Sequence, residues 1–389
     1  MAALRPITVF IFHPTHAFGG AEQTCLNLLK GINKEVFKIT LITSRQIASR
    51  FSETGIDKII YIDDIGLGVW FGSAGELWRD IKIAARVLRD ECPDIAFGMM
   101  HYSSTVLALA KKIFRLKSKV ISSPRGPSTT YLETCFSKKS ERAYLRFLFS
   151  CFCKYSDGII VPSEGTKIDC IENFGAKAKK VRAINNSIDF NEITLKYRED
   201  IDIIMPEDFF VIAAAGRLSP EKNMPLLLQA LSILKKQGEK IKLLIVGEGG
   251  EREKLENLSK SLGIHDDVVF AGFQSNPFKF LKKADIFVHT CMVEGFGNVI
   301  IEAMACGLPV VATDCPYGPR EIIEHGRNGL LVPLYDVDAL ADSINSLLAD
   351  ESARQIMSEA AVKRANDFSV EKMVGAYEDF LKFIIDKLI

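Results

Sequence analysis

Two glutamates stand eight residues apart in the stretch EGFGNVIIEAMACGLP, residues 294–309. Glu294 and Glu302 are the only charged residues of this stretch, and carboxylates are seldom buried without a partner. A turn that contains Gly297 precedes a predicted helix, residues 298–306, whose first N–H groups can bind an anion. Two carboxylates beside such a site can accept hydrogen bonds from hydroxyl groups. The pattern therefore suits a nucleoside diphosphate sugar, which has hydroxyls on both sides of its diphosphate.

The spacing of the two glutamates leaves two interpretations open. In the first, one glutamate binds the ribose of the ligand and the other binds the transferred sugar. In the second, Glu294 caps the helix and Glu302 forms an ion pair with Arg217 or Lys222. The residue types fit both interpretations equally well.

A pair of cations follows another predicted strand, in the stretch AAAGRLSPEKNMPLLLQA. Strand FFVIAAAG ends directly before Arg217, and Lys222 follows just before an apolar helix. Both side chains therefore leave the carboxyl edge of the predicted sheet. A guanidinium that binds two oxygens and an ammonium that neutralises the remaining charge suit a diphosphate. A salt bridge to Glu221 or to another surface acid is the alternative.

A glycine pair follows the first predicted strand, in HPTHAFGGAEQ, where Gly19 and Gly20 precede a helix that begins near Ala21. Glycine lets the backbone approach an anion closely, and the helix N-terminus supplies free N–H groups. A glycine turn with no ligand would have the same sequence. The stretch does not match GxGxxG, which argues against an ordinary dinucleotide-binding fold.

Three further polar residues of the first half follow predicted strands. His101 comes just after the strand in DIAFGMMHYSS, and Arg125 follows the strand in KVISSPRGPST. By topology both lie at a carboxyl edge, where they can contact an acceptor or a leaving group. The alternative for His101 is a structural hydrogen bond. His16, in the glycine-containing segment, is a weaker candidate.

The order of apolar segments indicates the fold class. Short β-rich runs alternate with longer amphipathic runs, which is the βαβ pattern of a parallel sheet. The pattern pauses in a polar, irregular segment that we interpret as a linker, residues 190–207. Since 389 residues exceed the roughly 250 to 300 at which one core stops growing, we expect two doubly wound α/β domains. They are residues 1–190, with a C-terminal helix at 370–389 packed back on them, and residues 191–369, and ligands bind in the cleft between them.

Charge is distributed unevenly although the chain is formally neutral. Residues 1–190 contain 27 Lys and Arg against 18 Asp and Glu, and the rest contains 22 against 31. A basic first half predicts an anionic partner such as a membrane surface or a phosphorylated acceptor, and solvated charge scattered around the fold is the alternative.

The cysteine pattern and the lengths of the apolar runs indicate the cellular compartment. Nine cysteines without a CxxC pair predict neither a disulfide framework nor a zinc ribbon, and fit a reducing cytosol. No apolar run approaches the roughly 18 residues of a membrane span. The apolar run near the start is too short for a signal peptide. We therefore expect a cytoplasmic chain whose membrane attachment, if any, is peripheral.

One segment combines cations and aromatic residues in the way that an interfacial helix does. Residues 137–155, SKKSERAYLRFLFSCFCKY, interleave five cations with tyrosine, leucine and phenylalanine. A helix packed on its own sheet has a similar composition. Together with KKIFRLKSK at 111–119, the segment favours contact with an anionic membrane.

Taken together, these motifs resemble those of retaining glycosyltransferases of the two-Rossmann-domain (GT-B) type, specifically family 4. That family includes bacterial lipopolysaccharide, capsule and lipid-linked oligosaccharide transferases. The resemblance spans nearly the whole chain. It rests on FGGAE, GRLSPEKN and LLIVGEG, and above all on EGFGNVIIEAMACGLPVVATD with its E-x7-E spacing.

The resemblance implies a role for each site residue. The donor diphosphate is bound by Arg217 and Lys222, and the backbone amides of Asn298 and Val299 assist. Glu302 holds the ribose, Glu294 contacts the donor sugar, and the base lies near Phe273. From the residues and the resemblance together, we predict the catalytic residues Glu294, Arg217, Lys222 and His101, and the donor-binding residues Gly19, Gly20, Arg217, Lys222, Phe273, Gly297, Asn298, Val299 and Glu302.

The resemblance also implies a reaction. A hexose or N-acetylhexosamine passes from a nucleotide diphosphate sugar, a UDP-sugar in the first instance, to a saccharide acceptor with retention at the anomeric carbon. No metal is required, in agreement with the absence of a convincing D-x-D motif, and no nucleic acid partner is expected. The segment DCPYGPREII resembles enzymes that extend polyprenyl-diphosphate-linked saccharides. A sugar-nucleotide epimerase and a non-catalytic sugar-nucleotide binder are the competing functions.

Overall fold

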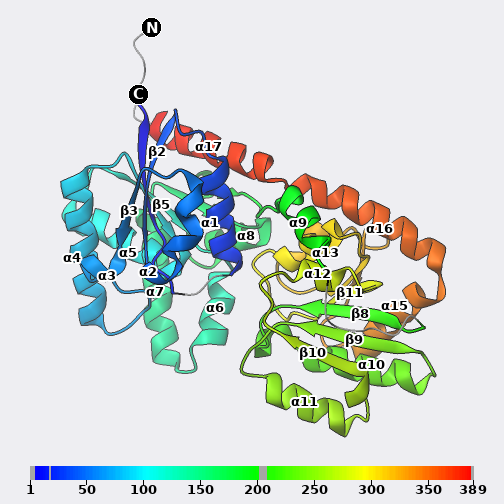
Figure 1. Ribbon diagram of the computed structural model, residues 1–389. Coiled ribbons are helices and arrows are strands. Elements are labelled where there is room, and N and C mark those ends of the chain that lie inside the picture. Colours follow the sequence, from blue (N-terminus) through cyan, green and yellow to red (C-terminus); the bar gives the residue numbers. More distant parts are fainter. Residues whose placement is uncertain (1–4, 17–18, 201–207, 387–389) are drawn as a thin grey trace. The chain divides into compact units, whose positions relative to one another are not determined.

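The computed structural model describes residues 5–16, 19–200 and 208–386. The chain divides into two compact units. Unit 1 comprises residues 1–187 and 370–389, and unit 2 comprises residues 188–369 (Figure 1). Each unit is a parallel sheet covered by helices, so the predicted α/β class is confirmed.

The sheet of unit 1 has seven strands in the order β3-β2-β1-β4-β5-β6-β7. All of its strand pairs are parallel, and Val9 of β1 pairs with Ile39 of β2 on one side and Ile95 of β4 on the other. Its strands are β1 (Ile7–Phe12), β2 (Phe37–Thr43), β3 (Lys58–Tyr61), β4 (Ile95–Met99), β5 (Lys119–Ser123), β6 (Gly158–Val161) and β7 (Val181–Ala183).

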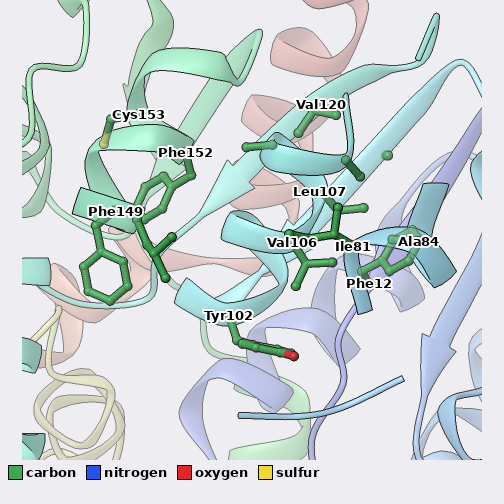
Figure 2. Packing of buried hydrophobic residues seen from close by; sticks show 14 of the residues in the cluster. Phe12, Ile81, Ala84, Tyr102, Val106, Leu107, Val120, Phe149, Phe152 and Cys153 are labelled. Atoms are coloured by element: carbon green, nitrogen blue, oxygen red, sulfur yellow. The ribbon is translucent and has the colours of Figure 1, made fainter. Parts of the chain in front are cut away.

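Helices cover both faces of this sheet because successive residues of a strand point to opposite faces. Phe10 and Phe12 pack with α4, α5 and α7 on one face, part of which Figure 2 shows. Val9 and Ile11 pack with α1 and α17 on the other. The helices of unit 1 are α1 (Gly20–Gly31), α2 (Arg45–Ala48), η1 (Ser49–Thr54), α3 (Ile62–Ile65), α4 (Ala74–Glu91), α5 (Met100–Phe114), α6 (Ser128–Cys135), α7 (Lys139–Tyr155), α8 (Glu164–Glu172), η2 (Ala178–Lys180) and α17 (Val370–Asp386).

The last helix, α17, belongs to unit 1 although it follows the whole of unit 2 in the chain. It packs beside α1, where a Cβ added at Gly31 would lie 2.7 Å from Val374. Phe380 and Ile384 contact β6 at Gly158 in the same way. The C-terminal segment thus completes the core of the first unit.

The sheet of unit 2 has six parallel strands in the order β10-β9-β8-β11-β12-β13. Residues of β8 alternate between two cores: Ile212 packs with α10 and α15, and Ala213 packs with α13 and α16. The strands are β8 (Phe210–Ala215), β9 (Ile241–Val246), β10 (Val268–Gly272), β11 (Ile286–His289), β12 (Val310–Thr313) and β13 (Leu330–Val332). The helices are α9 (Phe190–Tyr197), η3 (Pro220–Lys222), α10 (Met224–Lys236), α11 (Arg252–Ser261), η4 (His265–Asp267), α12 (Phe278–Leu281), α13 (Asn298–Ala305), α14 (Pro319–Ile322), α15 (Val337–Ala349), α16 (Glu351–Ala365) and η5 (Asn366–Phe368).

The predicted irregular linker at residues 190–207 is wrong at its start, because residues 190–197 form helix α9. Asp189 caps this helix by accepting a hydrogen bond from the backbone N–H of Glu192. The helix then buries Ile193 in the core of unit 2. The short helix was missed because its apolar residues cover only one turn of an otherwise polar segment. Residues 201–207 of the predicted linker lie outside the described residues.

Each sheet has a central point at which the strand order reverses. In unit 1 the chain leaves β1 for β2 on one side and later occupies β4 on the other. In unit 2 the same relation holds for β8, which lies between β9 and β11. Loops at the carboxyl ends of such strands diverge and leave room for a ligand. The loops after β8 and β11 are therefore the places where a ligand of unit 2 is expected.

The amphipathic segment at residues 137–155 forms helix α7, which packs on the sheet of unit 1. Phe149 and Phe152 are fully buried in the core of unit 1, so these two rings are not available for contact with a membrane. Tyr144 and Phe147 remain exposed, at 41% and 65%. Within the described residues, no helix combines the length and the apolar character that crossing a membrane requires.

Gly247, just after β9, permits the close approach of two loops at the carboxyl edge of unit 2. Its backbone N–H donates to the carbonyl of Gly272, and the neighbouring Gly216 N–H donates to the carbonyl of Val246. Its φ of 150° is unfavourable for other residues, and an added Cβ would lie 1.9 Å from the carbonyl oxygen of Gly216. Only glycine fits here.

We therefore expect Gly247→Ala to lower the free energy of unfolding by about 2 to 4 kcal/mol, because the methyl group forces the loop after β8 to move. Urea unfolding followed by circular dichroism measures the change. Gly250→Ala is the matched control, since an added Cβ there meets no atom within 4 Å. Equal stability of the two variants would contradict the close packing of these loops.

Candidate functional site

The two cations predicted to bind a diphosphate lie in the loop that follows β8. Arg217 is exposed directly after Gly216, and Lys222 ends the short helix η3. The alternative of a salt bridge to an acid is met for Lys222 by Glu294 and not by Glu221, whose carboxylate accepts a hydrogen bond from the Ser219 hydroxyl (2.5 Å). The ammonium of Lys222 points elsewhere.

Lys222 is paired with Glu294, the first glutamate of the E-x7-E motif. The Nζ atom lies 2.6 Å from Oε2, and both side chains are only 19% exposed. The two loops that carry them are joined by backbone contacts as well: Thr290 Oγ1 donates to the carbonyl of Lys222, and Met292 N–H donates to that of Glu221. The loop after β8 and the loop after β11 therefore form one structure.

His289, the last residue of β11, adds a second nitrogen beside Glu294. Its Nε2 lies 3.4 Å from Oε2 of the carboxylate. Burial alone would raise the pKa of Glu294, but the charge of Lys222 and the contact with His289 outweigh it and hold this pKa well below its usual range. Burial likewise opposes the charge of Lys222, yet Glu294 raises its pKa. Both members of the pair are ionised at neutral pH.

Helix α13 begins immediately beyond this pair. Its N-cap, Gly297, has φ 107° and lets the chain turn from the loop into the helix, with an added Cβ 3.6 Å from Glu294. Asn298 and Val299 form the first turn, where N–H groups and the helix dipole favour an anion. The predicted phosphate-binding helix start thus lies next to Glu294.

Glu302, the second glutamate of the motif, lies in the second turn of α13 in a different environment. Burial and, to a smaller extent, the charge of Glu192 raise its pKa to about 7 against the opposing charge of Lys196. Glu192 and Lys196 belong to α9 and form an ion pair of 2.6 Å. The interpretation in which Glu302 pairs with Arg217 or Lys222 is therefore wrong. Helix α9, which sequence analysis missed, sets the charge around Glu302.

Phe273, predicted to lie near the base, follows β10 at the same carboxyl edge. Its side chain is 75% exposed. Gly272 before it has φ 69° and closes against Gly247 through a backbone hydrogen bond. An exposed aromatic ring at this edge is available for stacking on a planar ligand.

In unit 1, the glycine pair after β1 is engaged by a carboxylate of its own helix. Glu22 Oε2 accepts a hydrogen bond from the N–H of Gly19 (2.8 Å), and Glu22 Oε1 lies 3.2 Å from Nε2 of the buried His13. Burial would raise the pKa of Glu22, but the contact with His13 lowers it overall. The N–H of Gly19 is thus occupied, which the glycine pattern alone did not indicate. His16, further along, is exposed.

His101 lies at the start of α5, directly after β4, but it is buried. Its ring stacks on Tyr131 with centroids 4.5 Å apart, and Nε2 forms a hydrogen bond of 3.0 Å with the Ser128 hydroxyl. Burial lowers its pKa to about 3, so the ring is neutral at physiological pH. This environment favours the structural alternative, and the catalytic role of His101 stays a prediction.

Arg125 lies after β5 and is held by groups from distant parts of unit 1. Its guanidinium donates to the hydroxyl of Tyr377 (3.0 Å) and to the side-chain oxygen of Asn186. Tyr377 belongs to α17, so the C-terminal helix orients this cation. Its Nε has no hydrogen-bond partner among the described residues, and its predicted contact with phosphate stays a prediction.

Sequence analysis missed three residues that shape the site of unit 2. His289 and Cys291 frame Glu294 from the end of β11, and Glu192 adds negative charge near Glu302. The sequence did contain a signal for His289. This histidine ends the strand directly before the motif, so it lies at the same carboxyl edge of the sheet. Glu192 had no such signal, since its helix is not evident from the pattern.

Two parallel α/β units, of which the second has a cation–carboxylate pair and a helix start at its strand reversal, define the class of GT-B glycosyltransferases. Solved structures agree in fold. HepE of Anabaena, in complex with UDP and glucose, aligns over 97% of this chain and 99% of its own, with a TM-score of 0.77 and 23% identity. Sucrose-phosphate synthase of Thermosynechococcus elongatus aligns over 98% and 100%, with a TM-score of 0.78 and 17% identity.

Comparisons of sequence identify the family. The family described as "Glycosyl transferases group 1" matches residues 198–364, and "Glycosyltransferase Family 4" matches residues 18–192. A Campylobacter jejuni enzyme, N-acetylgalactosamine-N,N'-diacetylbacillosaminyl-diphospho-undecaprenol 4-alpha-N-acetylgalactosaminyltransferase, is 32% identical over 280 residues, 72% of this chain and 73% of its own. The capsular polysaccharide biosynthesis glycosyltransferase CapM of Staphylococcus aureus is 31% identical over 64% and 68%. The chain belongs to this family of glycosyltransferases.

The environment of Glu302 predicts a pH-dependent stability. Its folded pKa of about 7 exceeds the ordinary value of 4.5, so the folded state keeps a proton that the unfolded state releases. The contribution of Glu302 to stability is therefore present below about pH 4.5 and is lost as the pH rises to about 7. Glu302→Gln removes this loss. Relative to the parent, the variant should gain about 2 to 3 kcal/mol of unfolding free energy between pH 4.5 and 8.

Urea unfolding of ligand-free protein at pH 4.5 and at pH 8 measures this gain. Glu253→Gln, at an exposed position of α11, is the matched control and should show no such difference. A stability difference between Glu302→Gln and the parent that is the same at both pH values would show that Glu302 ionises normally in the folded protein.

Proposed function

We propose that this glycosyltransferase moves a hexose or N-acetylhexosamine from a UDP-sugar to a lipid-linked saccharide, with retention of anomeric configuration, in the synthesis of a cell-surface polysaccharide. The observation that carries the donor part is the Lys222–Glu294 pair at the start of α13. Relatives named for lipopolysaccharide core, capsule and undecaprenol-linked saccharide synthesis support the acceptor class. A structural relative in complex with UDP-glucose supports the UDP-sugar.

In this proposal the diphosphate of the donor lies against Arg217, Lys222 and the first turn of α13. The exposed guanidinium supplies two donors in a fixed geometry, and the ammonium supplies a point charge that Glu294 already holds in place. Negative charge develops on the leaving diphosphate in the transition state, so cations fixed in advance stabilise it most. The proposed transfer takes place without a metal cofactor.

The two glutamates have different proposed roles because their charges differ. Glu294 is ionised and accepts hydrogen bonds from hydroxyls of the transferred sugar, close to the reacting carbon. Glu302, one helical turn further on, binds the ribose hydroxyls. A hydroxyl that donates to Glu302 would favour its ionised form, so that donor binding would lower the pKa of this carboxyl.

Substitution of the two cations should separate catalysis from stability. Arg217→Ala should lower kcat/KM by about 100- to 1000-fold without a change in stability, because the side chain is exposed. Lys222→Ala should lower kcat/KM similarly and also destabilise the fold by about 3 to 5 kcal/mol, since Glu294 is left buried without its partner. Turnover of UDP-sugars with a lipid-linked acceptor, followed by mass spectrometry, and thermal unfolding measure the two effects.

Lys254→Ala is the matched control, because this lysine is exposed and pairs only with Glu251 among the described residues. In the same assay, Glu302→Ala should weaken UDP binding, whereas Glu294→Ala should reduce turnover and leave UDP affinity nearly unchanged. Normal turnover by the Arg217 and Lys222 variants would remove the diphosphate from this site. Conversion of the UDP-sugar without an acceptor would indicate an epimerase, and binding without turnover would indicate a sugar-nucleotide binder.

We also propose that the protein works in the cytoplasm at an anionic inner membrane surface, with α7 as the contact. Tyr144 and Phe147 are exposed on this helix beside Lys138 and Lys139, at its N-terminal end. Exposed aromatic rings with adjacent cations suit the boundary between headgroups and acyl chains. A lipid-linked acceptor would be presented at such a surface.

Flotation with vesicles that contain phosphatidylglycerol should show binding that rises with the fraction of this lipid and falls with salt, since each cation near the surface contributes about 1 kcal/mol. Replacing Lys138, Lys139, Arg142 and Arg146 with glutamine should weaken the binding to vesicles. The double variant Tyr144→Ser, Phe147→Ser should remove the binding that persists at high salt. Ile356→Ser, at an exposed apolar position of α16, is the control. A parent protein that ignores lipid charge would contradict the proposal.

A further inference from the structure

Three groups that can bind a metal meet at the end of β11. His289, Cys291 and Glu294 each offer one ligand atom, a ring nitrogen, a sulfur and a carboxylate oxygen, and these atoms lie within 4.8 Å of one another. Two of them, His289 and Cys291, have no role in the proposed sugar transfer. His289 ends β11, and the other two lie in the loop between β11 and α13.

The histidine of this group is buried beside the carboxylate. His289 is 3% exposed, and its Nε2 lies 3.4 Å from Glu294 Oε2 without the geometry of a hydrogen bond. A buried ring nitrogen with so loose a contact is costly. Its position beside a thiol and a carboxylate is explained if a ligand binds between the three groups.

The sulfur of this group is buried as well. Cys291 is a free thiol that is fully buried, with its Sγ 2.6 Å from the carbonyl oxygen of Val293 and 3.1 Å from that of Glu221, so that its single S–H proton can donate to either. Cys315, a buried thiol that follows β12, donates to the carbonyl of Tyr317 (3.9 Å) and lies outside the group of three.

The chemical types of the three ligand atoms indicate which metal ion binds. Imidazole nitrogen, thiolate sulfur and carboxylate oxygen are the ligands that Zn²⁺ takes in tetrahedral sites, whereas Mg²⁺ and Ca²⁺ require oxygen ligands. We propose that His289, Cys291 and Glu294 supply the three protein ligands of a Zn²⁺ site whose fourth position is left to a small ligand from solvent. Binding replaces the thiol proton of Cys291, which passes to the solvent.

Occupancy of this site would act on the donor site, an inference that rests on the proposed function. Glu294 Oε2 accepts from Lys222 at 2.6 Å, and a divalent ion on the same carboxylate repels that ammonium. Zn²⁺ would therefore separate Glu294 from Lys222 and compete with the donor sugar for the carboxylate. The site is inhibitory, in contrast to the metal of a metal-dependent transferase.

Cobalt, which substitutes for zinc and absorbs light, provides the test. Co²⁺ added to the purified full-length protein should produce a thiolate charge-transfer band that saturates at one ion per chain and disappears on addition of one equivalent of Zn²⁺. Cys291→Ser should abolish the band, and His289→Gln should lower metal affinity about 100-fold or more, since even loss of an outer-shell partner costs 10- to 100-fold. Cys306→Ser, at the end of α13 and outside the group, should leave the band unchanged.

Lys222→Met provides a test in the opposite direction, and it does not depend on the folding of the cysteine variant. Removal of the competing ammonium should raise metal affinity about tenfold or more. Absence of a saturable band, a band that survives Cys291→Ser, or weaker binding by Lys222→Met would each overturn the site. Addition of UDP-sugar to the cobalt form should weaken the band. A band that follows the variants but ignores UDP-sugars would establish the metal site and contradict the proposed role of Glu294.

Discussion

The ion pair between Lys222 and Glu294 is the interaction on which the candidate site depends. It joins the loop after β8 to the loop after β11, and both side chains are largely withdrawn from solvent. Withdrawing two charges from water is costly, and the cost is offset only where the pair is close and well oriented. The further contacts of Thr290 and Met292 with the loop before Lys222 supply that orientation. A cation and a carboxylate are thus held ready at the start of α13.

The two glutamates of one motif have opposite electrostatic surroundings. Glu294 lies beside an ammonium, which lowers its pKa, whereas Glu302 lies beside the carboxylate of Glu192, and burial raises its pKa to about 7. A separation of eight residues along the chain is enough for this difference because charge interactions in a partly buried site fall off over a few ångströms. The E-x7-E motif therefore provides one ionised carboxylate and one that changes charge near neutral pH. Such a pair can serve two different hydroxyl-bearing parts of a ligand.

Unit 1 also has polar side chains at the carboxyl edge of its sheet. Most of these side chains form hydrogen bonds or ion pairs within the unit itself. Glu22 occupies the N–H of Gly19, His101 is neutral between Tyr131 and Ser128, and Arg125 is held by Tyr377 from the last helix of the chain. These contacts fix side chains before any ligand binds, which reduces the entropy lost on binding. They also explain why the C-terminal helix matters for the first unit: without α17, Arg125 would lose a partner and β6 its covering residues.

The parallel α/β class, the strands that carry each motif and the family resemblance were evident from the sequence, because alternating apolar runs and glycine turns are local features. The sequence also identified Arg217, Lys222, Glu294 and Glu302 as residues of one carboxyl edge, since strand ends of a parallel sheet share that edge. It left open which charges pair. Lys222 and Glu294 are 72 residues apart, and only the order of β8 and β11 in the sheet brings them together. Helix α9, the burial of His101 and the pKa of Glu302 were likewise decided by tertiary packing, because desolvation and the distance between charges depend on every element that surrounds a group.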